Sequence, residues 1–201
     1  MIELSVLQEE VAQCHKCEIA AKRRNTVFGE GNPDSPLMII GEGPGDQEDA
    51  TGRPFVGKAG KLLDLALADN QLDRTHVYIC NTVKCRACDW RNDKPYNRPP
   101  TDEETANCRN WLMQQIEIIK PKVILCVGAP SAKNLIRKDF KITKDRGILN
   151  KSEHCNAILA ALHPSYILRQ QSIGGDGGYS TLVADIKKAY ETAIKLKEAG
   201  K

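Results

Sequence analysis

The stretch GEGPGDQEDATGRPFVGKAG, residues 41–60, carries six glycines and follows directly on the apolar run PLMIIG at residues 36–41. Three further runs of the same kind are HVYICN (76–81), KVILCVG (122–128) and AILAALHP (157–164). All four are nearly continuous in apolar residues rather than alternating, which is typical of strands that are buried on both faces. We therefore predict four interior strands, the first of which ends at the glycine-rich stretch.

Helical patterns separate these strands. The segment TDEETANCRNWLMQQIEIIK (101–120) starts with Thr101 at an N-cap position and Glu104 at the capping-box position, and Pro121 ends it. Three more segments have apolar residues at helical spacing, and these are 60–72, 130–138 and 182–200. Strands that alternate with helices predict an α/β protein built on a central four-stranded parallel sheet.

Ligands of such sheets bind at the carboxyl ends of the strands. The four predicted strands end at or near Gly41, Asn81, Gly128 and His163, so these residues are expected to surround one site. Two stretches show no regular pattern and are expected to be irregular, namely 84–100 and 171–180. We expect residues 1–201 to form a single domain, with the N-terminal cysteine segment and the insert at 84–108 making a satellite lobe.

Composition sets limits on the kind of protein. The formal net charge is +3, which permits an anionic partner without requiring one. The N-terminus lacks the apolar core of a secretory signal, and no run approaches the roughly 18 apolar residues of a membrane span. A cytoplasmic protein without a membrane partner is expected. In a reducing compartment its eight cysteines predict metal ligands and buried thiols rather than disulfides.

The segment GRPFVGKA (52–59) matches the spacing of a phosphate-binding P-loop but lacks its chemistry. Ala59 stands where a P-loop needs a Ser or Thr hydroxyl for Mg²⁺, and Pro54 has no backbone N–H for a phosphate. The glycines at 41–45 also miss the dinucleotide-binding spacing. Close backbone approach at glycines, beside the flat ring of Phe55, instead suits a planar heterocycle such as a nucleobase.

Three motifs, GEGPGDQEDATGRPFVGKAG, NTVKCR (81–86) and HPSYILR (163–169), together resemble the uracil-DNA glycosylase superfamily. The resemblance runs from Cys14 to about Arg169 and is closest to the family 4 enzymes that contain an iron–sulfur cluster. It implies a three-layer sandwich and a monofunctional DNA-repair hydrolase. Such an enzyme flips uracil, the product of cytosine deamination, out of single- or double-stranded DNA and cleaves its N-glycosidic bond, leaving an abasic site. We expect it to act as a monomer.

The resemblance also implies roles for individual residues. Phe55 matches the aromatic residue that stacks on uracil, and Asn81 matches the amide that reads its N3–H and O4 edge. His163 matches the histidine that donates to uracil O2 as charge develops there. The structural alternatives are a core phenylalanine, a turn asparagine and a buried histidine.

The sequence does not determine which residue activates the attacking water. Several related families have Asp or Asn at the third position of the first motif, where this chain has Gly43 beside the bound base. Either a carboxylate acts from another position, or the step relies on electrostatics alone. The candidate carboxylates are Glu48, which we favour, and Glu42, whose alternative role is to brace the loop. Glu48 has a different alternative role, as a wall that excludes the methyl group of thymine.

The HPSYILR motif implies a loop that enters DNA. Apolar side chains there can fill the gap left by the flipped base, and Arg169 can meet a phosphate. The residues expected at DNA are Ser165, Tyr166, Ile167, Leu168 and Arg169.

The cysteines allow two metal sites. Spacing alone pairs Cys14-x₂-Cys17 with Cys85-x₂-Cys88, which would make a Cys₄ zinc site. The family resemblance instead implies a [4Fe–4S] cluster on Cys14, Cys17, Cys85 and Cys108, with a longer insert between the last two than the family leads us to expect. Competing hypotheses are a zinc-stabilised nucleic-acid-binding module without catalysis and a nucleotide-binding enzyme with a degenerate P-loop.

Overall fold

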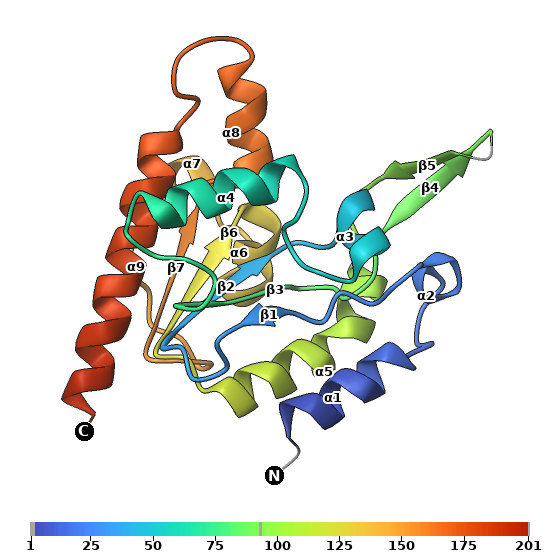
Figure 1. The fold of residues 1–201 in the computed structure, drawn as a ribbon, viewed down its shortest axis with the longest axis horizontal. Coiled ribbons are helices and arrows are strands. Elements are labelled where there is room, and N and C mark those ends of the chain that lie inside the picture. Colours follow the sequence, from blue (N-terminus) through green and yellow to red (C-terminus); the bar gives the residue numbers. More distant parts are fainter. Residues whose placement is uncertain (1–2, 93, 201) are drawn as a thin grey trace.

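The computed structural model of the chain describes residues 3–92 and 94–200. It contains the four expected strands, which run parallel to one another (Figure 1). They are β2 (Leu37–Gly41), β3 (Tyr78–Asn81), β6 (Val123–Val127) and β7 (Ala157–Ala161).

The sheet differs from the expected one by a fifth strand. The two-residue strand β1 (Glu30–Gly31) pairs antiparallel with β3, so the sheet is mixed, in the order β1-β3-β2-β6-β7. A strand of two residues is too short to show an alternation of apolar and polar residues in the sequence. Its pairing needs a glycine, because a Cβ on Gly31 would lie 2.1 Å from the carbonyl oxygen of Val77.

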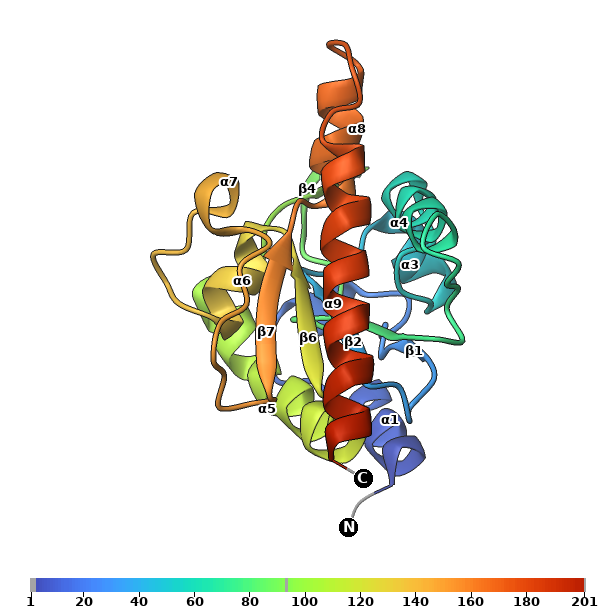
Figure 2. The same cartoon turned by 90° about the vertical axis from the view of Figure 1, so that its left-hand side faces the viewer.

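The central strands are buried on both faces, as their continuous apolar sequences predict. Alternate residues point to opposite sides. Ile39 and Leu125 belong to one core cluster, and Ile40 and Cys126 belong to the other. Helices therefore cover both faces of the sheet, and the molecule has three layers (Figure 2).

Four helices lie where the sequence predicts them, and they are α4 (Lys58–Ala68), α5 (Asp102–Ile119), α6 (Ala129–Leu135) and α9 (Tyr179–Ala199). The capping box is confirmed, because the Thr101 hydroxyl accepts from the Glu104 N–H and the Glu104 carboxylate accepts from the Thr101 N–H. Helices α4 and α9 pack on the first core cluster, and α5 and α6 pack on the second.

Two sequence expectations are corrected. Residues 84–100, expected to be irregular, contain a hairpin of β4 (Cys88–Arg91) and β5 (Lys94–Asn97). The DNA-entering loop expected at 165–169 is part of a helix, α8 (Pro164–Gln171). The hairpin strands are mostly exposed, and α8 spans only eight residues, so neither element shows a long apolar period in the sequence. The remaining elements are α1 (Leu4–Ala12), α2 (Ile19–Lys22), α3 (Asp46–Thr51) and α7 (Ile142–Asp145).

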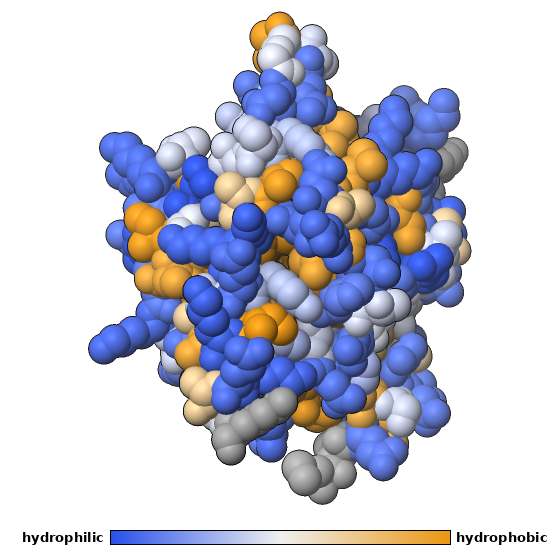
Figure 3. Space-filling model, turned by 60° about the vertical axis from the view of Figure 1, so that its left-hand side comes forward, coloured by the Kyte–Doolittle hydropathy of each residue, from blue (hydrophilic) through white to orange (hydrophobic). Residues whose placement is uncertain are grey.

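Two arms rise from the carboxyl edge of the sheet. Figure 1 shows α8 and the β4–β5 hairpin projecting beyond the strand ends, on either side of α3 and the end of β2. The surface view in Figure 3 shows mostly hydrophilic residues with scattered apolar patches. Among residues 3–92 and 94–200, no helix combines the length and the apolar character that a membrane crossing requires.

Candidate active site

One pocket opens at the carboxyl edge of the sheet, between the two arms. Its walls come from the end of β2, from α3 and the loop that follows it, from the end of β3, from the root of the hairpin and from the start of α8. The residues predicted from sequence that line it are Glu42, Gly43, Glu48, Phe55, Asn81, His163, Ser165 and Arg169. The ends of β2, β3 and β7 therefore converge here as expected, whereas Gly128 after β6 contacts His163 but is not among the residues that line the pocket.

Gly41 brings the aromatic ring and the amide of the site together. A Cβ at this position would lie 2.4 Å from Oδ1 of Asn81 and 2.5 Å from Cζ of Phe55. These separations are far shorter than any contact that real side chains make, so only glycine lets both side chains close over the end of β2. The glycine that ends the first strand is thus a packing requirement of the pocket.

Asn81 ends β3 and is 2% exposed. Among the described residues no hydrogen-bond donor reaches its Oδ1 atom, although the backbone carbonyl of the same residue accepts from Nζ of Lys84 at 2.8 Å. A buried acceptor without a partner costs about 1–3 kcal/mol. Because Asn81 lines the pocket, a ligand N–H is the group that would satisfy it.

Phe55 is 5% exposed and has a left-handed backbone, with φ of 53°. Two features hold this unusual conformation. The guanidinium of Arg74 donates to the carbonyl oxygens of Pro54 and Phe55. Gly60 gives the loop room, because a Cβ there would lie 1.7 Å from the Phe55 carbonyl oxygen. The ring centroid lies 6.0 Å from that of His163, and the two planes are 31° apart.

His163 is the N-cap of α8, and its orientation is fixed through one ring nitrogen. Nδ1 accepts from the backbone N–H of Ser165 at 3.1 Å and lies 2.7 Å from the Ser165 hydroxyl. In the neutral ring the proton therefore resides on Nε2, which can act as a donor. Burial lowers the pKa of His163 to about 4, with the charge of Arg169 adding to the effect. The imidazole is neutral at pH 7.

The carboxylate of Glu48 ties together the loop that carries Phe55. Its Oε1 accepts from the backbone N–H groups of Val56 and Gly57, both at 2.9 Å, and its Oε2 accepts from Gly45 at 3.1 Å. These three bonds occupy both oxygens. Glu48 lies in the pocket wall as expected, but its geometry is that of a brace.

Glu42 has the opposite environment. It follows β2, lines the pocket and is half-buried. In the described part of the chain, its carboxylate takes part in no hydrogen bond or ion pair, and burial raises its pKa. A carboxylate held in this way is a stronger base than one in water. The adjacent Gly43 has no room for a side chain, because a Cβ there would lie 2.8 Å from Val83.

The residues expected to enter DNA divide into two groups. Ser165 and Arg169 line the pocket, and Tyr166 is 37% exposed. Ile167 is fully buried in the first core cluster, and Leu168 packs against that cluster. The expectation that both apolar residues fill a gap in DNA is therefore wrong for Ile167, because α8 turns it toward the sheet.

Sequence reasoning missed the wall contributed by the hairpin root. Asn97 and Arg98 line the pocket there, followed by Pro99 and Pro100. Arg98 is held by a bidentate ion pair with Glu104, at 2.6 and 2.7 Å. The Arg- and Pro-rich composition was visible in the sequence, but nothing in it indicated which strand end the segment would approach.

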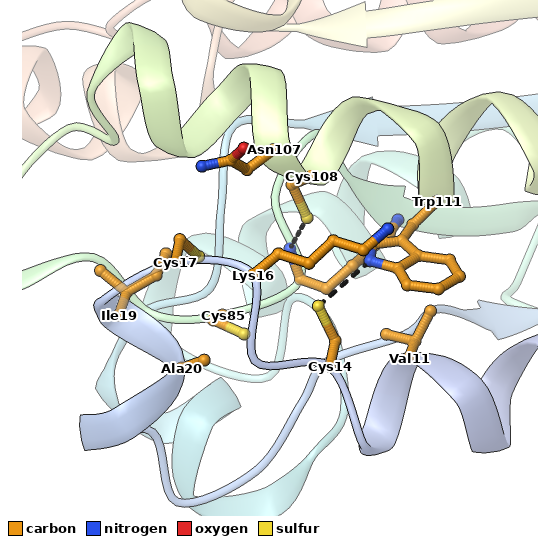
Figure 4. Close-up of a pocket in the computed structure, with 11 residues that line it drawn as sticks. Val11, Cys14, Lys16, Cys17, Ile19, Ala20, Cys85, Asn107, Cys108 and Trp111 are labelled. Carbon is orange, nitrogen blue, oxygen red and sulfur yellow. Dashed lines mark hydrogen bonds between the residues drawn. The ribbon is translucent and has the colours of Figure 1, made fainter.

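A second pocket, lined by four cysteines, lies between the end of α1, α2, the segment after β3 and the first half of α5. Figure 4 shows four cysteine side chains directed toward a common space. They are Cys14, Cys17, Cys85 and Cys108, the set expected from family resemblance. Cys88 is not among the lining residues, because it belongs to the hairpin. The structure thus brings together ligand candidates that are far apart in sequence.

Nitrogen donors surround these thiols. Cys14 Sγ accepts from the indole of Trp111 at 3.3 Å, Cys108 Sγ from the N–H of Lys84 at 3.2 Å, and Cys85 Sγ from Arg23 at 3.5 Å. Such donors favour a thiolate over a thiol. Burial raises the pKa of Cys85 to about 11, although the nearby Arg23 charge lowers it.

Across residues 3–92 and 94–200, no group of three or more His, Cys, Asp or Glu side chains is arranged to hold a single metal ion. All eight cysteines are free thiols, and the two in the central strands, Cys80 and Cys126, are fully buried as expected.

Comparison with known proteins places the chain in a family. Residues 28–187 match the family model described as the uracil DNA glycosylase superfamily. The matched span includes Phe55, Asn81 and His163.

Several relatives are similar over most of the chain. A type-4 uracil-DNA glycosylase of Thermotoga maritima is 44% identical over 170 residues, which cover 84% of this chain and 85% of that protein. The proteins of the same name from Sulfurisphaera tokodaii and Archaeoglobus fulgidus are each 38% identical. The first alignment covers 98% of this chain and 88% of that protein, and the second covers 84% of each.

Proposed function

Because the chain belongs to the uracil DNA glycosylase superfamily, we propose that it is a DNA-repair enzyme that flips uracil out of DNA and hydrolyses the N-glycosidic bond. Its relatives named type-4 uracil-DNA glycosylase support uracil as the base removed. The products are free uracil and an abasic site in DNA, and one water is consumed. A single domain acting as a monomer is sufficient, since one chain supplies the whole pocket.

The observation that carries the proposal is the unpartnered Oδ1 of Asn81. In uracil, N3–H is a donor and O4 is an acceptor, so the Asn81 amide can accept from the first and donate to the second. Cytosine has an acceptor at N3 and a donor at N4, which is the reverse pattern. A fixed amide therefore selects uracil and leaves a buried polar group unpaired with cytosine.

Phe55 and Gly43 form the parts of the pocket that contact the flipped uracil ring. The Phe55 ring, held by its left-handed backbone, stacks on the flipped uracil. Gly43 lets the backbone approach the base closely, because it has no side chain. Glu48 fixes the loop that carries Phe55, and its catalytic assignment becomes one of positioning.

His163 acts on the departing base. As the bond to the sugar breaks, its electron pair moves onto uracil, and negative charge develops at O2. The Nε2–H of the neutral His163 ring donates to that oxygen, and one donor of this kind stabilises a transition state by about 3 kcal/mol. The Nδ1 contacts with Ser165 keep the proton on Nε2.

We assign water activation to Glu42 rather than to Glu48. A hydroxyl oxygen must reach C1′ of the sugar as the oxocarbenium-like centre forms, and a nearby carboxylate can take the proton. The carboxylate of Glu42 is available for this step, while both oxygens of Glu48 are occupied by backbone N–H groups. The negative charge of Glu42 also stabilises the positive sugar.

Around the sulfur pocket, we propose that Cys14, Cys17, Cys85 and Cys108 hold a [4Fe–4S] cluster. Support comes from the four convergent thiols and the N–H donors directed at three of them. When bound, the cluster would serve as a structural cross-link. These cysteines join the segment after α1, the segment after β3 and helix α5, and thereby fix the base of the hairpin.

Helix α8 contacts the DNA strand beside the pocket through Ser165, Tyr166 and Arg169. Leu168 packs against the first core cluster and holds the helix in place. Arg169 supplies positive charge for a phosphate.

The test of the whole proposal is the release of free uracil from a uracil-containing oligonucleotide, in single- and double-stranded form. Binding without release would favour the alternative of a non-catalytic nucleic-acid-binding module.

A further inference from the structure

The β4–β5 hairpin presents two chemically different faces. In an antiparallel pair, residues opposite each other point to the same side, and the side alternates along each strand. The register pairs Cys88 with Asn97 and Trp90 with Pro95 on one face. The pairs Asp89–Tyr96 and Arg91–Lys94 lie on the other face.

The face that carries Trp90 is continuous with the active-site pocket. Asn97, on the same face, lines that pocket. Trp90 lies two residues further out along the hairpin, which corresponds to about 7 Å. Its side chain is 48% exposed, an unusual state for the largest apolar residue type. An open indole therefore stands just outside the pocket rim.

Ion pairs and hydrogen bonds of Arg86 and Arg98 fix the root of the hairpin. They thereby limit how far the strand that carries Trp90 can move relative to the pocket. Arg86 donates to Oδ1 of Asn97 at 2.7 Å and pairs with Asp46 of α3 at 2.5 Å. Arg98 joins Asp89 of the hairpin to Glu104 of α5, at 3.1 and 2.6 Å. Both arginines cross-link the hairpin to helices beside the pocket.

Positive charge lies on the opposite face of the same hairpin, beside Tyr96. Arg91 is 71% exposed and lies over the ring of Tyr96, with its guanidinium carbon 5.6 Å from the ring centroid. Lys94 is also exposed. Proteins that bind single-stranded nucleic acid stack bases on aromatic rings, and nearby cations attract the phosphates. On this hairpin Trp90 and the two cations lie on opposite faces of one narrow ribbon, so the cations add positive charge near the strand without contacting the indole.

We infer that Trp90 is a base-stacking platform for the DNA strand that carries the uracil, at a nucleotide one or two places from the flipped one. The inference rests on the proposed function, since it places the strand across the pocket. Stacked bases are about 3.4 Å apart, so a distance of about 7 Å from the rim reaches the first or second neighbour. This contact is separate from the recognition of uracil itself.

Single-turnover excision from a single-stranded uracil oligonucleotide, measured against enzyme concentration, tests the inference. Loss of one base–aromatic stack lowers affinity by about 5- to 150-fold. Trp90→Ala should raise the half-saturating enzyme concentration by that factor, while the limiting rate changes by less than about twofold. Trp90→Phe should recover part of the affinity. Tyr96→Ala, an exposed aromatic on the opposite face, is the matched control and should behave as the wild type.

Substrates with one neighbouring base removed identify the stacking partner. For the wild-type protein, an abasic site at one of the first two neighbours should weaken binding as much as Trp90→Ala does, and the variant should be insensitive to the same change. Stacking should also quench tryptophan fluorescence. Of the two tryptophans in the chain, Trp111 is 8% exposed, so the quench should disappear in Trp90→Phe.

The outcomes separate the two proposals. If the wild type releases no uracil, the proposed function fails. If it releases uracil but Trp90→Ala binds as tightly as the wild type, or no more weakly than Tyr96→Ala, the stacking role of Trp90 is overturned and the glycosylase assignment stands.

Discussion

The pKa of His163 leads to a prediction about acid conditions. Burial holds this pKa at about 4 in the folded protein, compared with 6.5 for an ordinary histidine. The folded state therefore resists protonation, and between these values the unfolded chain binds more protons. By linkage, the free energy of unfolding must fall as the pH drops through 6.5, and the contribution of His163 is fully lost below about pH 4.

The magnitude follows from the two pKa values. Their difference of about 2.5 corresponds to about 3 kcal/mol once the pH is below both, and at pH 5 about 2 kcal/mol of this is already lost. The assay is urea unfolding at pH 8 and pH 5 for the wild type and for His163→Gln, which has no titrating ring. The wild type should lose about 2 kcal/mol more than the variant.

Catalysis provides an independent readout of the same titration. Because the ring stays neutral down to about pH 5, its Nε2 donor remains intact, and the single-turnover rate should show no inflection near pH 6.5 from this group. An NMR titration of the His163 ring should likewise show no change between pH 8 and pH 5.5. A ring that titrates near 6.5, or equal losses of stability in the two proteins, would refute the reasoning.

Three further predictions concern the remaining groups. Asn81→Asp should slow uracil excision by about a hundredfold or more, because a carboxylate cannot donate to O4, and near-normal excision would remove Asn81 from base reading. Glu42→Gln should lower the single-turnover rate by at least about a hundredfold with little change in DNA affinity, whereas loss of affinity alone would assign Glu42 to binding. The purified protein should contain iron and acid-labile sulfide. Cys108→Ala should lose both with the visible colour and Cys88→Ala should keep them, and the reverse result would mean that the hairpin cysteine is a ligand.

The sequence alone determined the four parallel strands and which strand ends carry the pocket residues Asn81 and His163. Four short, continuous apolar runs favour strands buried on both faces, and the helical segments between them favour parallel connections. Strand ends then meet at one edge, so Asn81 and His163 had to converge with the glycine-rich stretch. The capping box of Thr101 and Glu104 was also predictable from the sequence, because it depends only on two residues three positions apart.

Only the tertiary structure decided what each carboxylate and each cysteine does. Glu42 and Glu48 are the same residue type in the same motif, so the sequence does not distinguish their roles. The backbone N–H groups of Val56 and Gly57 bind the carboxylate of Glu48 and leave that of Glu42 without such donors. Cys88 has the better local spacing, yet Cys108 lines the sulfur pocket because α5 packs there. The hairpin face that carries Trp90 also depends on register. Such properties arise from contacts between segments far apart in the chain, which no local pattern encodes.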